Sequence, residues 1–194
     1  MKMQVDEIKD IITASIALIF IFSYPEFLSD ASILVVSAMA IATGFVLHEL
    51  SHRLIANKFG VEARFRIWRN GLIMALLLAV VTNGSFVFAA PGAVVINNFR
   101  FSFRQGMRPL GKREYGIISA AGPVTNLVLA LIFLAIHSIV PLNAFVYATS
   151  INVSLALFNM IPIPPLDGSK VISWDPAAWA VIVGSIIFFR TFLI

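Results

Sequence analysis

The sequence predicts an all-α polytopic membrane protein with about five spanning helices and a small membrane-associated β element at about residues 61–96. Two observations predict this class. Hydrophobic residues make up 59% of the 194 residues and charged residues only 12%, whereas soluble domains have about half apolar and a quarter charged residues. The apolar residues also gather in long runs, and a helix needs about 20 such residues to cross a bilayer. The uniform composition predicts one integral membrane domain over residues 1–194.

Five apolar segments are the candidate spanning helices, at residues 8–24, 31–59, 115–140, 142–163 and 177–194. The stretch between the second and third segments has a different pattern. Residues 61–68 alternate apolar and charged side chains, which is the period of a half-buried strand. Residues 71–82 are a short apolar run, and residues 86–96 are rich in β-forming residues but interrupted by Pro91-Gly92. This stretch therefore predicts the β element.

The basic residues predict which side of the membrane the loops face. They cluster on either side of residues 71–96, at Arg53, Lys58, Arg64, Arg66, Arg69, Arg100, Arg104, Arg108, Lys112 and Arg113. The loops at residues 25–30 and at Pro141 carry none, so the positive-inside rule places both basic stretches in the cytoplasm. Residues 71–96 must then return to the side they left. Twelve helical residues reach only about 18 Å, which favours a re-entrant or interfacial hairpin over two full spans.

The same distribution of charge bears on the class of partner. The basic residues lie next to apolar segments, which is typical of membrane topology signals and not of a nucleic-acid-binding surface. The sequence has no cysteine, which excludes disulfides and thiolate metal sites. We therefore expect the lipid bilayer as a partner and no nucleic acid.

His48, Glu49 and His52 form the strongest chemical signal, a His-Glu-x-x-His pattern in the second apolar segment. Residues four apart share one face of a helix, so both imidazoles can bind one metal ion. Zinc accepts imidazole nitrogen, and a catalytic zinc keeps one position open for water. Glu49 would stand beside that position, take a proton from the zinc-bound water and deliver it to the leaving nitrogen. The alternative is two packed histidines and an acid at a helix end, but such a cluster inside a membrane is costly without a function.

A third ligand is needed, and the sequence offers two candidates. In the predicted topology His137 lies near the extracellular end of the third apolar segment, far from His52 at the cytoplasmic end of the second, so it is interpreted as a packed or interfacial histidine. Asp167 follows the fourth segment, which runs toward the cytoplasm, and therefore arrives on the side of His48. Prolines within residues 162–165 end that helix and leave extended backbone that can present the acid. Taken alone, this acid would be a plain turn residue.

Three motifs in this order resemble the site-2 protease family of intramembrane zinc metalloproteases. They are His-Glu-x-x-His at 48–52, Gly-Pro-x-x-Asn at 122–126, and Asn-x-x-Pro followed by Leu-Asp-Gly within 159–168. The resemblance covers about residues 40–170. It implies one zinc ion per chain, held by His48, His52 and Asp167, with Glu49 as the general base. It also implies that Asn159 lies near the catalytic centre, where it could donate a hydrogen bond to the developing oxyanion.

Two further implications of the resemblance are less specific. Asn126 either positions substrate or only joins helices. The β element at residues 61–96 would pair with an unwound substrate at a free edge near residues 86–96, although an inert hairpin that shields the site from lipid is the alternative. The chain departs from larger relatives in having one predicted span after Asp167 and no separate regulatory or peptide-binding domain.

The predicted function is an intramembrane zinc metalloendopeptidase. It would hydrolyse peptide bonds in or near the transmembrane segment of a single-span membrane protein. Its location would be the cell membrane, as a multi-pass protein whose active site lies toward the cytoplasm. A metal transporter is a rival, but transporters often carry repeated halves and have no use for Glu49. A catalytically silent relative is a second rival, and the intact Glu49 argues against it.

Overall fold

The computed structural model describes residues 4–89, 91–96, 99–102 and 106–193. Ala90, Arg104 and Ile194, which belong to segments or residue sets discussed above, lie outside these ranges. In chain order the elements are α1 (Val5–Ser23), the 3-10 helix η1 (Glu26–Leu28), α2 (Ser32–Lys58), β1 (Ala63–Ile67), α3 (Arg69–Val81), β2 (Gly92–Ile96), β3 (Phe99–Ser102), β4 (Gly106–Pro109), α4 (Lys112–Ile139), α5 (Asn143–Asn159), α6 (Asp167–Trp174) and α7 (Pro176–Phe192). The chain is mostly helical, as predicted.

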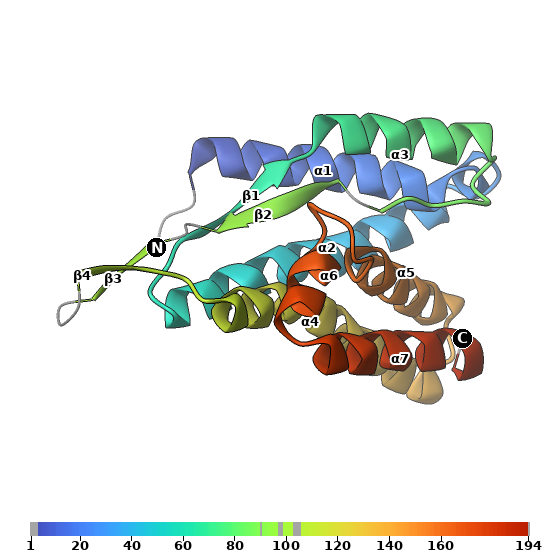
Figure 1. The fold of residues 1–194 in the computed structure, drawn as a ribbon. Helices are drawn as coiled ribbons and strands as arrows, with labels where there is room; N and C mark the ends of the chain where they lie inside the picture. Colours follow the sequence, from blue (N-terminus) through green and yellow to red (C-terminus); the bar gives the residue numbers. More distant parts are fainter. Residues whose placement is uncertain (1–3, 90, 97–98, 103–105, 194) are drawn as a thin grey trace.

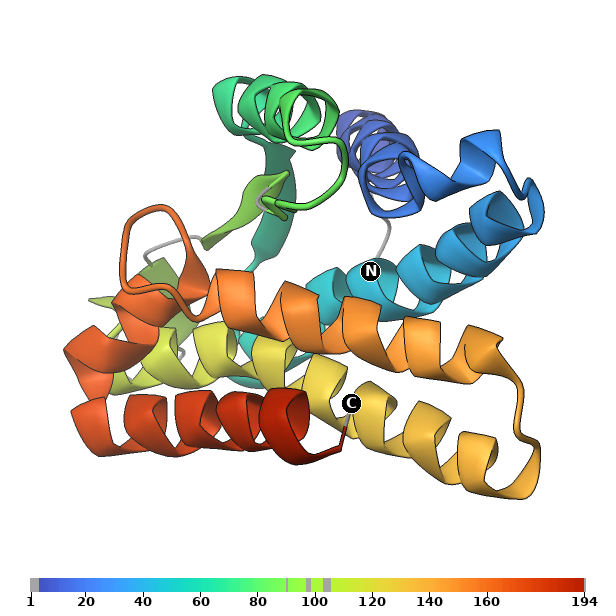
Figure 2. The same cartoon turned by 90° about the vertical axis from the view of Figure 1, so that its right-hand side faces the viewer.

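The helices form two layers with a small sheet between them. Figure 1 and Figure 2 show α1 and α3 side by side on one face, and a bundle of α2, α4, α5, α6 and α7 on the other. Strands β1 and β2 lie between these layers, and the β3–β4 hairpin extends from one end of the molecule (Figure 1). Helix α4 packs against α2, α5 and α6, so it is the central helix of the bundle. The core around α1, α2 and α5 contains fully buried Leu18, Ile41 and Leu155.

The sheet consists of two antiparallel strands, with Ala63 opposite Ile96 at one end and Ile67 opposite Gly92 at the other. The predicted strand at 61–68 is confirmed as β1. The predicted β-rich segment at 86–96 is a strand only from Gly92 onward. Pro91 has no amide hydrogen, so it cannot donate a hydrogen bond to β1. The backbone N–H of Trp68 still donates to the carbonyl of Pro91, at 2.9 Å.

The outer edge of β1 is covered by α1. The backbone N–H of Phe65 donates to Glu7 Oε1 at 3.3 Å, and that of Ile67 donates to Asp10 Oδ2 at 3.4 Å. Because successive residues of a strand point their N–H groups to opposite sides, residues 64 and 66 of β1 face β2. Their partners in the register are Val95 and Ala93. It follows that Gly92, Val94 and Ile96 turn their backbone groups away from β1.

A buried ion pair joins this layer to the helix that carries His48 and His52. Glu7 Oε2 accepts from Arg53 Nη1 at 2.8 Å, and both side chains are buried. Glu7 thus contacts α2 through one oxygen and β1 through the other. A carboxylate in the first turn of α1 also suits the positive end of the helix dipole. The acidic start of α1 is therefore a tertiary contact and not a solvent-exposed tail.

The prediction of five spanning helices is not supported by helix length and composition. Among the described residues, two helices are long and apolar enough to cross a membrane, α2 with 27 residues and α4 with 28. Helix α1 has 19 residues but begins earlier than predicted and includes four charged residues in its first turns. Helix α5 has 17 residues because it ends at Asn159, before the proline-rich turn, and not at residue 163. Helix α7 also has 17 residues.

Three elements were not predicted as such from the sequence. The apolar run at 71–82 is the helix α3, whose 13 residues would extend only about 20 Å. The polar stretch before α4 contains the two-stranded β3–β4 hairpin. The segment after the proline-rich turn forms α6, an eight-residue helix that the sequence reading missed. The next helix, α7, begins at Pro176. Asp175 is its N-cap, and its side chain accepts hydrogen bonds from the N–H groups of Ala177 and Ala178.

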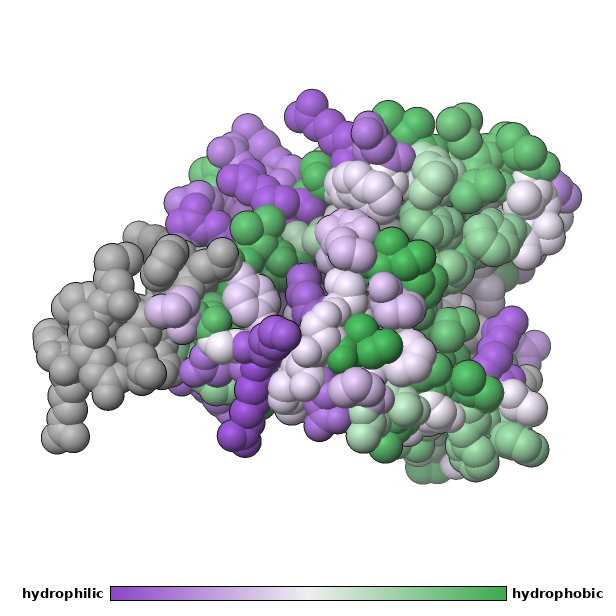
Figure 3. All heavy atoms as spheres, in the orientation of Figure 1, coloured by the Kyte–Doolittle hydropathy of each residue, from purple (hydrophilic) through white to green (hydrophobic). Residues whose placement is uncertain are grey.

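The surface is divided between hydrophobic and hydrophilic residues. In Figure 3, hydrophobic residues dominate the right-hand part of the face shown, and hydrophilic residues gather toward the left. Large apolar side chains that are exposed include Leu77 and Val81 of α3, Ile139 of α4 and Phe192 of α7. Soluble monomers rarely expose large contiguous apolar patches.

Candidate metal centre

The two histidines lie on the buried face of α2. The buried residues of this helix recur every three or four positions and include Gly44, Phe45, His48 and His52. His48 is 2% exposed and His52 is 1% exposed. Their rings lie 4.7 Å apart between centroids and nearly perpendicular to each other. The four-residue spacing therefore does what was predicted and places both imidazoles on one face.

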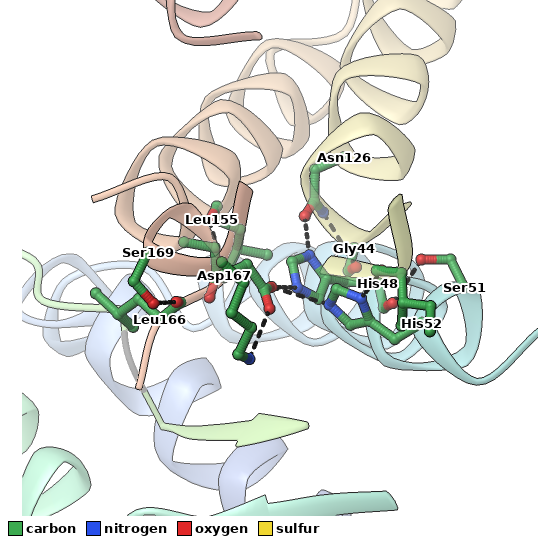
Figure 4. A network of polar contacts seen from close by, with 12 residues as sticks. Gly44, His48, Ser51, His52, Asn126, Leu155, Leu166, Asp167 and Ser169 are labelled. Atoms are coloured by element: carbon green, nitrogen blue, oxygen red, sulfur yellow. Dashed lines mark hydrogen bonds and ion pairs between the residues drawn. The ribbon is translucent and has the colours of Figure 1, made fainter. Parts of the chain in front are cut away.

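Asp167 reaches the histidines from α6. Its Oδ2 lies 3.4 Å from His48 Nε2 and 3.0 Å from His52 Nε2, as Figure 4 shows. Among the described residues, these three side chains form the group of His and acidic residues that could hold a metal ion. Asp167 is the first residue of α6, and Leu166 directly before it has extended backbone.

The turn before α6 brings this acid back to the bundle. The carbonyl of Met160, just after α5, accepts a hydrogen bond from Trp179 Nε1 of α7 at 2.8 Å. Gly168 packs against the same carbonyl, since a Cβ at this position would lie 2.2 Å from the Met160 oxygen. Only glycine allows this approach, which holds the start of α6 against the end of α5. The Leu-Asp-Gly sequence is therefore a packing requirement as well as a ligand signal.

Helix α4 determines which nitrogen of each imidazole faces the acid. His48 Nδ1 lies 2.6 Å from Asn126 Oδ1, and His52 Nδ1 lies 2.7 Å from the carbonyl of Ile118. Both partners are oxygen atoms that accept, so each Nδ1 carries the hydrogen. Each Nε2 is then left with a lone pair on the side of Asp167, which is the arrangement that a metal ligand requires.

A buried amide pair fixes Asn126 in this role. Its Nδ2 donates to the carbonyl of Gly44 at 3.1 Å and to Asn152 Oδ1 at 3.0 Å (Figure 4 shows the first of these partners). Asn152 in turn donates to the carbonyl of Ala148 at 2.9 Å. Both asparagines are fully buried. The network joins α2, α4 and α5 behind the histidines, so Asn126 contacts the candidate centre and does more than join helices.

The donor set fits zinc on three observations. A tetrahedral zinc with bonds of about 2.0–2.1 Å separates its ligand atoms by roughly 3.3 Å, and Asp167 Oδ2 lies 3.4 and 3.0 Å from the two Nε2 atoms. Glu49 Oε2 is buried and has no hydrogen-bond partner among the described residues. The donor types also fit, because zinc accepts imidazole nitrogen and carboxylate oxygen, and both Nε2 atoms face Asp167 Oδ2.

The other predicted site residues lie as follows. The Nδ2 of Asn159, the last residue of α5, donates to the carbonyl of Leu155 at 3.0 Å. Its predicted hydrogen bond to the developing oxyanion stays a prediction. His137 Nδ1 lies 3.1 Å from the carbonyl of Leu142, at the far end of α4. This position agrees with the prediction that His137 is not a ligand.

The structure adds residues that the sequence reading did not identify. Lys170 Nζ lies 3.4 Å from Asp167 Oδ1, so the two oxygens of Asp167 have different partners. The Ile118 carbonyl could not be recognised, because a backbone group leaves no residue-type signal. Asn152 could have been recognised, because it is an amide inside an apolar segment. Such side chains in membrane helices usually bind a polar partner on another helix.

A groove of about 680 Å³ runs beside the centre. One wall is β2, at residues 93–95, and the other is formed by the proline-rich turn at residues 162–165 and by α6. Lys112 and Lys170 also line it. Lys170 contacts Asp167, so the groove lies next to the candidate metal centre, although neither histidine nor Asp167 lines it.

Comparison with known proteins supplies the metal and the reaction class. A protein of Methanocaldococcus jannaschii that carries the name "putative zinc metalloprotease" is 39% identical over 181 residues, covering 91% of this chain and 88% of that protein. A Bacillus subtilis protein with the same kind of name is 29% identical over 161 residues, covering 69% of this chain and 66% of that protein. No family model matches the chain, and no solved structure matches it.

Proposed function

Because the chain belongs to the zinc metalloprotease family of its Methanocaldococcus jannaschii relative, we propose that it is an intramembrane endopeptidase of the site-2 type. The single observation that supports this most strongly is the group formed by His48, His52 and Asp167. Two of these residues lie in α2, which is long and apolar enough to cross a membrane. Ionisable residues inside such helices are costly and usually functional.

The reaction is the hydrolysis of a peptide bond. Zinc held by His48, His52 and Asp167 would polarise the scissile carbonyl and make the attacking water more acidic. Glu49 Oε2, which has no partner among the described residues, accepts the proton of that water and passes it to the leaving nitrogen. Asn159 would donate to the developing oxyanion through the second hydrogen of its Nδ2, since the first is accepted by the carbonyl of Leu155.

The membrane location rests on exposed apolar surface. In the most apolar stretch of both α2 and α4, only 33% is buried. A core helix of a soluble protein would be largely buried, so the rest of this surface is better matched by lipid. We propose a multi-pass protein of the cell membrane in which the shorter helices α1, α5 and α7 also cross. The basic residues flanking the sheet orient the active site toward the cytoplasm.

The proposed substrate is the transmembrane segment of a single-span membrane protein, bound in an extended form. Its peptide bonds are hidden inside its own helix, so it must unwind before water can attack. The edge of β2 that carries the backbone groups of Val94 lies along the groove and would offer them to the unwound chain. The opposite wall contains three prolines, which have no N–H to offer. Backbone pairing is therefore proposed on the β2 side.

The function is tested with purified protein in lipid vesicles and a panel of single-span substrates, analysed by mass spectrometry. We expect a cut within or near the span, loss of the cut with a chelator, and its return when zinc is added. Glu49→Gln should not cut. The same sequences offered as soluble unfolded peptides are the control. If only the soluble peptides are cut, the protein is a metalloprotease without intramembrane specificity. If chelated protein or Glu49→Gln cuts at the wild-type rate, the mechanism is wrong.

A further inference from the structure

One stripe of α4 faces the two histidines. Ile118, Gly122 and Asn126 follow one another at intervals of four residues and therefore share a face of the helix. The first and last bind the Nδ1 atoms of His52 and His48. Gly122 lies between these two anchors, directly against the imidazoles.

Gly122 leaves space that any side chain would fill. A Cβ at this position would lie 2.4 Å from His48 Nε2 and 2.4 Å from His52 Nε2, much closer than carbon and nitrogen approach without a bond. The rings cannot easily retreat, because each Nδ1 is held by α4 and both side chains are buried. A zinc ion on the same two atoms would be about 2.0–2.1 Å from each. A Cβ would thus stand nearly as close to both donor atoms as the metal does.

We propose that Gly122 is a metal-positioning residue, because its missing side chain keeps both Nε2 atoms accessible to zinc. Glycine is a poorer helix former than alanine in a helix interior, so this position needs a reason for it. The competing reason is close packing of α4 on α2, for which small residues are common in membrane helices. The inference rests on zinc binding at this site and does not depend on the identity of the substrate or on cleavage.

The first test is the zinc affinity of Gly122→Ala, measured by competition with a chelator and checked by metal analysis. We expect the zinc affinity to fall by about 10- to 100-fold, which is the range for loss of residues that support a metal ligand. Two glycines are matched controls. Gly116→Ala, also in α4, would contact the side chain of Trp174 and should disturb packing but keep zinc affinity. The Cβ added by Gly184→Ala would have no neighbour within 4 Å, so this change should alter neither packing nor zinc affinity. Wild-type zinc affinity in Gly122→Ala overturns the proposal.

The second test separates the imidazole contact from general packing. In metal-free protein, Gly122→Ala should lower the midpoint of thermal unfolding. The same change should have little effect in the His48→Ala/His52→Ala background, where the rings are gone. If Gly122→Ala alone does not fold and the triple variant does, the proposal is supported. An equal loss of stability in both backgrounds, or failure of both to fold, shows that Gly122 serves helix packing, and the proposal is then wrong.

Discussion

Each imidazole at the metal centre has one hydrogen bond that decides which nitrogen remains for zinc. For His48 the partner is a side-chain amide, Asn126, and for His52 it is the backbone carbonyl of Ile118. A side-chain partner can be removed by mutation and a backbone carbonyl cannot. His48 is therefore the ligand whose orientation can be tested directly, because supporting residues of this kind tune metal affinity.

Asn126→Leu should weaken zinc binding about 10- to 100-fold, since it removes the acceptor that holds His48 Nδ1–H. Asn152→Leu should have a smaller effect, because Asn152 contacts Asn126 and not the ring. Chelator competition measures both. Equal affinities for Asn126→Leu and wild type would show that this amide does not control the ligand.

Glu49→Gln should keep zinc and lose cleavage. The amide is nearly the same shape as the carboxylate but cannot take a proton from water, and loss of a general base typically costs about 10²–10⁴ in rate. Zinc content and the rate of substrate cutting are measured on the same preparation. Cleavage at the wild-type rate would remove Glu49 as the base, whereas loss of zinc would show that it supports the metal.

At this scale the sequence predicted the residues with a distinctive chemistry and missed those without one. His48, Glu49, His52 and Asp167 could be named because two histidines four apart and an acid on the same side of the membrane are rare in apolar segments. The residues of α4 that surround the histidines were undecided, as for Asn126, or were not predicted, as for Ile118. Gly122 was noticed only as part of a family motif, because a missing side chain carries no chemical signal until its neighbours are known.

At the scale of elements, the sheet has one covered edge and one that faces the groove. Glu7 and Asp10 of α1 occupy N–H groups of β1, whereas β2 has no third strand beside it among the described residues. At one end of that edge, Tyr115 Oη donates to the carbonyl of Ile96 at 3.4 Å. The middle of the edge, at Val94, is therefore the part proposed to receive substrate.

Val94→Pro should lower cleavage while zinc content stays normal. Val94 lies opposite Phe65 and directs its N–H away from β1, so proline removes a donor to substrate without removing a ladder bond. Val94→Ala keeps the N–H and controls for the side chain. Val95→Pro should instead weaken the sheet, because Val95 faces β1. If Val94→Pro folds, binds zinc and cuts normally, the sheet only shields the site.

Glu7→Gln should destabilise the protein, because it removes the carboxylate charge that pairs with the buried guanidinium of Arg53. Breaking a buried pair of this kind typically costs about 3–5 kcal/mol. Glu62 is the matched control, since its pair with Arg64 is partly exposed and its loss should be barely measurable. Thermal unfolding in detergent measures both. Similar small losses for Glu7→Gln and Glu62→Gln would show that the α1 contact is not a major source of stability.

The elements that could be predicted were those with a clear period or length. The alternation at 61–68 predicts β1, and the two longest apolar runs predict α2 and α4. Helix α6 was missed because it has eight residues and follows three prolines, which indicate a turn. Helix α5 was drawn too long because an apolar run can continue after the helix has ended, and Pro162 and its neighbours set the true end.

For the whole molecule, the basic stretches before and after residues 71–96 should face the same side of the membrane. Cysteines introduced at Asn70 and Lys112, both exposed, can report this in a chain that has no cysteine of its own. An impermeant thiol reagent should label both from the cytoplasmic face of sealed vesicles. Labelling from opposite faces would make the segment between them a true crossing and would contradict the proposed orientation of the centre.

The whole fold brings Asp167 to a pair of histidines that lie far from it in sequence. Helix α4 orients the rings, and the turn held by Met160 and Gly168 returns α6 to them. This convergence was predicted from membrane topology, yet within the part of the chain that the structure describes, two helices have the length and composition of a span. The contacts between helices could not be read from the sequence, because every apolar segment offers several equivalent faces.

The most direct test is the zinc content of wild type, His48→Ala, Asp167→Ala and His137→Ala, each purified after exposure to excess zinc. We predict one zinc per chain in wild type and in His137→Ala, and a clear loss in His48→Ala and in Asp167→Ala. Circular dichroism confirms that each variant is folded. Full zinc occupancy in folded Asp167→Ala, or loss of zinc in His137→Ala, would contradict the central claim that α2 and α6 together form the metal site.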